Sequence, residues 1–164
     1  DYKPKAIMNI LVLCTGNSAR SILLESIMTH RSGGRVTAFS AGSKPAGRVH
    51  PQALRLLDAN DYPTDQLRSK SWDEFGADGA PKMDVVITVC GSAAAQECPY
   101  WPGAPIRVHW GVEDPAAAAE PDWDAAFTTA YDQLHRRAMA FLTLDIAHMP
   151  QATLTKELTQ IGTL

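Results

Sequence analysis

IMNILVLCTGNSARS, residues 7–21, is the stretch of this sequence that decides its fold. It begins with a short, mostly apolar run from Ile7 to Leu13, rich in branched side chains, which predicts a buried strand. The small residues from Cys14 to Ser18 then indicate a loop. Apolar side chains recur at helical spacing between Ala19 and Ile27, and Gly33-Gly34 predicts the end of that helix.

The rest of the chain repeats this alternation of strand and helix. Further strands are expected at Val36–Ser40, Val85–Val89 and Ile106–Trp110, and further helices at Gln52–Asn60, Asp124–Leu144 and Leu154–Ile161. Strands that are apolar throughout and alternate with helices are typical of a parallel sheet covered by helices on both sides. The sequence therefore predicts an α/β fold.

Length and composition narrow the function classes. The 164 residues suit one domain, expected over residues 8–164, with the first seven as an N-terminal extension or expression remnant before Met8. A net charge of −3 argues against nucleic acid or an anionic membrane as partner. The polar start is unlike a signal peptide, so we expect a cytoplasmic protein with reduced thiols. Three cysteines, an odd number, favour reactive thiols over a disulfide framework.

The loop after the first strand has the composition of an anion site. Successive N–H groups between a strand and a helix can form a nest for a tetrahedral anion, and the helix adds its positive end. Arg20 can hold two oxygens of that anion in a bidentate fork. Gly16 is expected to let the backbone approach and to take an unusual dihedral angle. The same field favours the thiolate form of Cys14, with Ser18 or Ser21 as its hydrogen-bond partner.

Other interpretations of these residues are weaker. Cys14 could be an inert cysteine that ends a strand before a capped helix, but its place between a strong strand and a strong helix favours the anion loop. A nucleotide phosphate loop needs Gly-Lys-Ser/Thr, which is absent here. A zinc site needs close pairs of Cys or His, which the sequence also lacks.

The segment Cys14-Thr15-Gly16-Asn17-Ser18-Ala19-Arg20-Ser21 resembles the signature loop of low-molecular-weight protein tyrosine phosphatases and of the arsenate reductases built on that fold. The resemblance implies a four-stranded parallel sheet flanked by helices on both faces. It also implies Cys14 as nucleophile and Arg20 as anion clamp, with an oxyanion cradle formed by Thr15, Gly16, Asn17, Ser18, Ala19 and Arg20. Ala19 stands where many thioredoxin-coupled reductases have another cysteine, so no redox role is expected for it.

A second segment, His109-Trp110-Gly111 followed by Asp114-Pro115-Ala116, resembles a loop of the reductases. The resemblance implies that Asp114 is the general acid that protonates the departing oxygen, and Glu113 is the alternative acid. In the phosphatases an aromatic residue usually follows Asp-Pro, whereas here Ala116 does. This difference favours the reductases.

Cys90 and Cys98 carry the expectation of redox chemistry. Either could be an inert thiol, an interpretation that suits Cys90 at a strand end better than Cys98 in a polar stretch. The segment from Val89 to Pro99 resembles the redox region of thioredoxin-type arsenate reductases. The resemblance implies that Cys90 attacks the arseno-cysteine at Cys14, that Cys98 then forms a disulfide with Cys90, and that thioredoxin, or glutaredoxin with glutathione, reduces it.

No tightly bound cofactor is expected. Asn17, Glu25 and Ser40 align with residues that bind a potassium ion in some relatives, but local hydrogen bonds or a solvated side chain are the favoured interpretation here. The predicted function is reduction of arsenate to arsenite in arsenic detoxification. The alternatives are a phosphatase acting on phosphotyrosine or small phosphoesters, and a non-enzymatic anion-sensing module.

Overall fold

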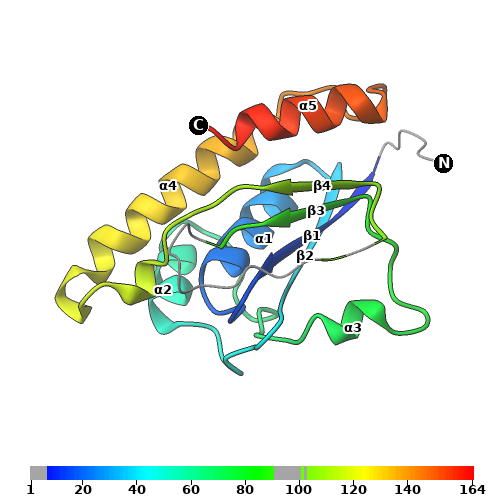
Figure 1. Ribbon diagram of the computed structural model, residues 1–164. Helices are drawn as coiled ribbons and strands as arrows, with labels where there is room; N and C mark the ends of the chain where they lie inside the picture. The colour runs from blue at the N-terminus through cyan, green and yellow to red at the C-terminus, as the bar shows by residue number, and fades with distance from the viewer. Residues whose placement is uncertain (1–6, 91–100, 102) are drawn as a thin grey trace.

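Four parallel strands form the centre of the molecule, as the computed structural model of residues 7–90, 101 and 103–164 describes it. They are β1 (Met8–Cys14), β2 (Val36–Gly42), β3 (Val85–Thr88) and β4 (Ile106–His109), in the spatial order β2-β1-β3-β4 (Figure 1). β1 is central and almost entirely buried, which explains why all of its residues except Asn9 are apolar. Its carboxyl end, where the anion loop begins, therefore lies between two neighbouring strands.

Helices cover both faces of the sheet, but unequally. The helices are α1 (Arg20–Arg31), α2 (Pro51–Ala59), α3 (Asp73–Gly76), α4 (Trp123–Leu142) and α5 (Gln151–Ile161), with 3-10 turns η1 (Pro115–Ala117) and η2 (Glu120–Asp122). Side chains of α1, α2, α4 and α5 share one core cluster with one face of β1. The opposite face is covered by Trp72 and by Phe75 of the short α3. The expected fold is thus confirmed.

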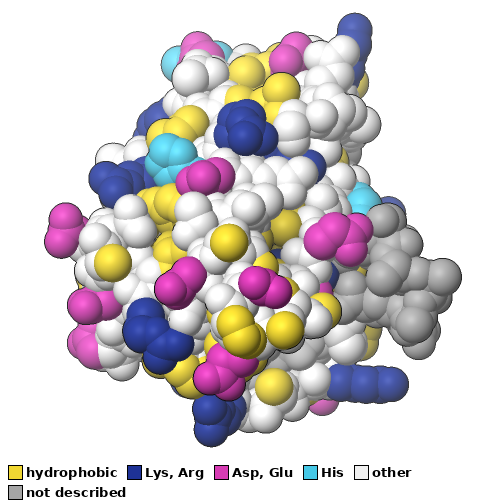
Figure 2. Space-filling view, turned by 90° about the vertical axis from the view of Figure 1, so that its left-hand side faces the viewer, with side chains coloured by type: hydrophobic (Ala, Val, Ile, Leu, Met, Phe, Trp, Pro, Cys, Tyr) yellow, Lys and Arg dark blue, Asp and Glu magenta, His cyan; other side chains and the backbone are white. Residues whose placement is uncertain are grey.

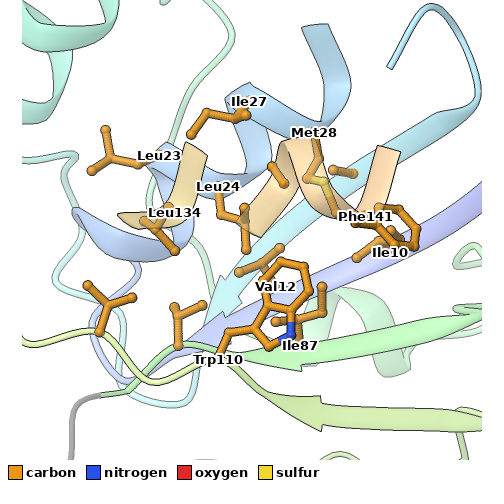
Figure 3. Packing of buried hydrophobic residues seen from close by; sticks show 14 of the residues in the cluster. Ile10, Val12, Leu23, Leu24, Ile27, Met28, Ile87, Trp110, Leu134 and Phe141 are labelled. Atoms are coloured by element: carbon orange, nitrogen blue, oxygen red, sulfur yellow. The ribbon is translucent and has the colours of Figure 1, made fainter. Parts of the chain in front are cut away.

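The larger core lies between the sheet and α1 and α4. Figure 3 shows Ile10 and Val12 of β1 packed below α1, with the indole of Trp110 against the same cluster. Trp110 is fully buried, and its Nε1–H donates to the carbonyl of Leu158 in α5 at 2.9 Å. A buried indole needs such a partner, so this bond fixes α5 beside the end of β4.

The element boundaries agree with the sequence expectations to within three residues. The structure corrects two details. The short helix α3 was not expected, and neither were the 3-10 turns η1 and η2. Among the helices that the structure describes, none is both long enough and apolar enough to cross a bilayer.

Candidate active site

The anion loop connects the end of β1 to the start of α1, as the sequence predicts. It begins at Cys14, which is 2% exposed and is the last residue of β1, and ends at Arg20, the first residue of α1. The positive end of the α1 dipole is therefore directed at the loop. No side chain caps this helix, so its N-terminal N–H groups are not shielded by a capping oxygen.

The loop is anchored through its carbonyl groups. The carbonyl of Thr15 accepts from the Lys44 N–H at 3.0 Å, that of Gly16 from the Ala46 N–H at 2.8 Å, and that of Ser18 from the His50 N–H at 2.8 Å. These partners all lie in the segment between β2 and α2, so the carbonyls point outward. In a trans peptide the carbonyl of one residue and the N–H of the next point in opposite directions. Outward carbonyls therefore leave the following N–H groups directed towards the loop centre, which forms the nest that a tetrahedral anion requires.

The unusual backbone angle belongs to Asn17 rather than to Gly16. Asn17 has φ 48°, whereas Gly16 is not among the residues with positive φ, so the expectation for Gly16 was wrong. Asparagine tolerates this region because its short polar side chain can hydrogen-bond locally. The crowded glycine is instead Gly42 at the end of β2, where a Cβ would overlap the carbonyl oxygen of Thr15 and lie 3.1 Å from the Asn17 nitrogen.

A chain of hydrogen bonds leads from the thiol into the protein. Cys14 Sγ lies 2.9 Å from Ser21 Oγ, and the Asn17 N–H donates to Cys14 Sγ at 3.3 Å. Asn17 Nδ2 donates to Ser21 Oγ at 2.8 Å and to Ser40 Oγ at 3.0 Å. A thiolate has no hydrogen and can only accept, so when Cys14 is ionised the Ser21 hydroxyl donates to its sulfur. Of the two serines considered from sequence, the structure places Ser21 at the thiol.

The inner end of this chain is a carboxylate. Ser40 donates its hydroxyl hydrogen to Glu25, so Asn17, Glu25 and Ser40 meet as the resemblance suggests. Burial raises the pKa of Glu25, and the nearby Lys70 ammonium opposes that shift. Burial also lowers the pKa of Lys70. Both groups are therefore held in an environment that disfavours an isolated charge.

Arg20 connects the anion loop to the loop that carries the candidate acid. Its side chain is 5% exposed, and its Nη1 donates to the carbonyl of Val112 at 2.9 Å. Its Nη2 lies 3.9 Å from Asp114 Oδ2. The guanidinium is thus oriented before any anion arrives, and it faces the carboxylate across the site.

Asp114 is held at the start of η1. Its Oδ1 accepts from the Ala116 N–H at 3.0 Å, which leaves Oδ2 on the side of Arg20. Glu113, the alternative acid, is exposed. The structure brings Asp114 to the guanidinium that would hold the oxyanion.

Cys90 follows β3, the strand that pairs with β1 on the side opposite β2. β3 pairs with β1 up to Leu13 and Thr88, so Cys14 and Cys90 leave the sheet at the same edge. Both cysteines are buried and belong to the same core cluster. Cys98, the other thiol expected to take part, lies outside the described residues.

Attraction of an anion to this site is local. On the face shown in Figure 2, Asp and Glu side chains lie among Lys, Arg and hydrophobic side chains rather than apart from them. The net charge of −3 gives no long-range attraction for an anion. Affinity for an oxyanion must therefore come from the loop, from α1 and from Arg20.

Sequence reasoning missed several residues that support the loop. Ser69 Oγ donates to the Gly16 carbonyl at 3.1 Å, the Lys70 N–H donates to Asn17 Oδ1 at 2.9 Å, and Gly42 packs directly against the loop. Ser69 and Lys70 act from a turn more than fifty residues away in the chain, where no local pattern marks them.

Comparison with known proteins finds a matching family, similar sequences and similar structures. The family described as low molecular weight phosphotyrosine protein phosphatase matches residues 9–159. An arsenate reductase of Halalkalibacterium halodurans is 34% identical over 134 residues, 80% of this chain and 93% of that protein. The structure of an arsenate reductase in its phosphate-binding state has a TM-score of 0.68 and 26% identity, covering 84% of this chain and 98% of that one. A thioredoxin-dependent arsenate reductase of Corynebacterium glutamicum shares the fold, at TM-score 0.51 and 22% identity over 78% of this chain and 58% of that one.

Proposed function

Because the chain belongs to the low molecular weight phosphotyrosine protein phosphatase family, we propose that it is a member that reduces arsenate to arsenite, with Cys14 as the nucleophile. The observation that carries this proposal is a second buried thiol, Cys90, at the same sheet edge as Cys14 and in the same core cluster. A phosphatase needs only its nucleophile, whereas a reductase needs a thiol that can supply two electrons. Arsenate reductases of Halalkalibacterium halodurans and Bacillus subtilis are 34% and 33% identical to this chain, which supports the same conclusion.

The first step is formation of a sulfur–arsenic bond. Arsenate binds to the N–H groups of the loop and to Arg20, whose Nη1 is already oriented by the carbonyl of Val112. The Cys14 thiolate attacks arsenic, and the departing oxygen leaves as water after taking a proton from Asp114. The bond from Ser21 and the N–H of Asn17 hold the sulfur in line for this attack.

The second step transfers the electrons. Cys90 thiolate attacks Cys14 Sγ, a disulfide forms between the two sulfurs, and the sulfur–arsenic bond breaks. The electron pair of that bond stays on arsenic, which leaves as arsenite in its trivalent state. Cys98 then attacks Cys90, which releases Cys14 as a thiolate and forms a Cys90–Cys98 disulfide. The part of Cys98 is proposed from its sequence context alone.

An external dithiol must reduce that disulfide. We assign this to thioredoxin, with glutaredoxin and glutathione as the alternative donor. The resemblance of the Cys90 and Cys98 region to thioredoxin-coupled reductases supports this assignment. The relay works only where free thiols are kept reduced, which supports a cytoplasmic location.

A phosphoester is the second candidate substrate, because the family is named for phosphatases and the loop would hold phosphate as it holds arsenate. Ala116, half-buried in η1, stands where an aromatic side chain would frame a phosphotyrosine. We therefore expect weak hydrolysis of small phosphoesters and poor use of phosphotyrosine.

Single-turnover chemistry tests the proposal. Cys98→Ser should release a single arsenite per molecule without an external donor and accumulate a Cys14–Cys90 disulfide that peptide mass spectrometry detects. Cys90→Ser should release none unless a small thiol is added, and Cys14→Ser should be inactive under all conditions. Absence of arsenite release by the wild type with every donor, together with full phosphoester hydrolysis by the Cys90→Ser, Cys98→Ser double variant, would leave the phosphatase.

A further inference from the structure

Lys70 is a charged residue at the base of the site for which the proposed reaction has no direct use. Its Nζ lies 3.9 Å from Glu25 Oε1, and the two side chains are only 9% and 19% exposed. The same ammonium donates to the carbonyl of Arg68 at 3.0 Å, while the backbone N–H of Lys70 donates to Asn17 Oδ1. Lys70 therefore contacts the carboxylate of Glu25 and the amide of Asn17, which both belong to the hydrogen-bond chain that leads to Cys14.

The oxygens that align with a potassium site in some relatives do not fit such an ion here. Asn17 turns its oxygen towards the Lys70 N–H and its nitrogen towards Ser40, and Ser40 donates its hydrogen to Glu25. A cation at this point would replace these bonds. It would also lie close to the positive charge that already neighbours Glu25.

We propose that the Lys70 ammonium is a built-in cation that replaces potassium in this chain and positions the hydrogen-bond chain beneath Cys14. This inference rests on the proposed role of Cys14 as nucleophile. The ammonium acts through Glu25, whereas the backbone N–H of Lys70 holds Asn17, so Lys70 is a positioning residue rather than a catalytic one.

The direction of each bond shows how the position is fixed. The Lys70 N–H holds Asn17 Oδ1, which forces the amide nitrogen to face both serines. The ammonium favours the ionised form of Glu25, and an ionised carboxylate can only accept the hydrogen of Ser40. With both ends of the chain fixed, the Ser21 hydroxyl has its hydrogen available for the thiolate.

A lysine here has a further consequence, because a covalently attached cation cannot dissociate. The ionic composition of the solution should then have no specific effect on the nucleophile. Loss of the ammonium should leave the half-buried carboxylate of Glu25 without its counter-charge. A small side chain at position 70 should also leave space in which a free cation can bind. That variant should regain the potassium dependence that the wild type lacks.

The experiment measures alkylation of Cys14 by iodoacetamide, in a background where Cys90 and Cys98 are serine, with KCl compared against NaCl at equal ionic strength. This readout needs neither arsenate nor a redox partner, so it can fail while the proposed reaction stands. Lys70→Ala is the test variant and Lys70→Arg retains the charge. Lys156→Ala, which removes an exposed lysine of α5, is the matched control.

The wild type, Lys70→Arg and Lys156→Ala should react at the same rate in both salts. Lys70→Ala should react about 10-fold more slowly in NaCl, the loss expected for one charge-assisted contact, and KCl should restore much of that rate. If Lys70→Ala does not fold, Lys70→Gln, which keeps the length of the side chain, replaces it. A wild-type rate that responds to potassium, or an unchanged rate in the neutral variants in NaCl, would overturn the proposal.

Discussion

Replacement of Gly42 by alanine is the sharpest test of how the anion loop is held. A Cβ at Gly42 would overlap the Thr15 carbonyl oxygen and lie 3.1 Å from both the nitrogen and the Cβ of Asn17. Gly42 cannot retreat, because its N–H donates to the Lys70 carbonyl at 2.9 Å and its carbonyl accepts from the Trp72 N–H at 3.0 Å. The loop must therefore move instead of the strand.

The size of the effect follows from that displacement. Overpacking of a tight contact lowers the free energy of unfolding by about 1–3 kcal/mol. A shift of the loop by about 1 Å should lower the rate of arsenite release by about 100-fold, since the N–H groups and Cys14 would no longer be aligned. The assays are urea unfolding and single-turnover arsenite release.

Gly16→Ala is the matched comparison for stability. A Cβ at Gly16 meets only Ser18 Oγ, at 3.7 Å, and the backbone there is not left-handed. Alanine should therefore be neutral or raise the free energy of unfolding by about 0.4–1 kcal/mol. Equal stability of the two variants, or wild-type arsenite release by Gly42→Ala, would refute the conclusion that β2 holds the loop in place.

Two further variants test residues around the anion, and a third tests a histidine at the start of α2. Arg20→Lys should raise the arsenate concentration for half-maximal rate by more than 10-fold, because an ammonium cannot both bind the Val112 carbonyl and grip two oxygens. Asp114→Asn should slow pre-steady-state arsenite release by about 10²–10⁴-fold while the dissociation constant for phosphate, measured by calorimetry, stays unchanged. Burial lowers the pKa of His50 below 6.5, and its Nδ1 accepts from the Gln52 N–H at the start of α2. The stability that this neutral ring contributes is present above about pH 6.5 and lost as the pH falls through its folded pKa, so His50→Asn, which keeps an acceptor, should flatten the decline of unfolding free energy in acid.

The sequence was sufficient to predict the sheet, the loop and its first helix because these depend on contiguous residues. The apolar run of β1 is buried on both faces, and the apolar side chains of α1 that recur at helical spacing, such as Ile22, Leu23 and Ile27, are buried in the core. Cys14 and Arg20 are separated by the length of one loop, so their meeting at one anion site follows from the strand-to-helix order alone.

The support of the loop could not be predicted in the same way. Gly42 and Lys70 reach it through the pairing of β1 with β2 and through a turn after α2, and neither contact leaves a local pattern. The sequence also favoured Gly16 for the strained position because glycine tolerates positive φ best. Asn17 takes that position because the same residue must supply three hydrogen bonds to its neighbours, which glycine cannot do.

The contacts that hold Cys14 in place assign the motion that the relay requires. Cys14 is fixed by the β1 ladder, by the N–H of Asn17 and by Ser21, and the loop that follows it is anchored through its carbonyls. The β3 ladder ends at Thr88, before Cys90. Displacing Cys14 would break the anion site while arsenic is still bound to it. We therefore expect Cys90 to approach a stationary Cys14 when the disulfide forms.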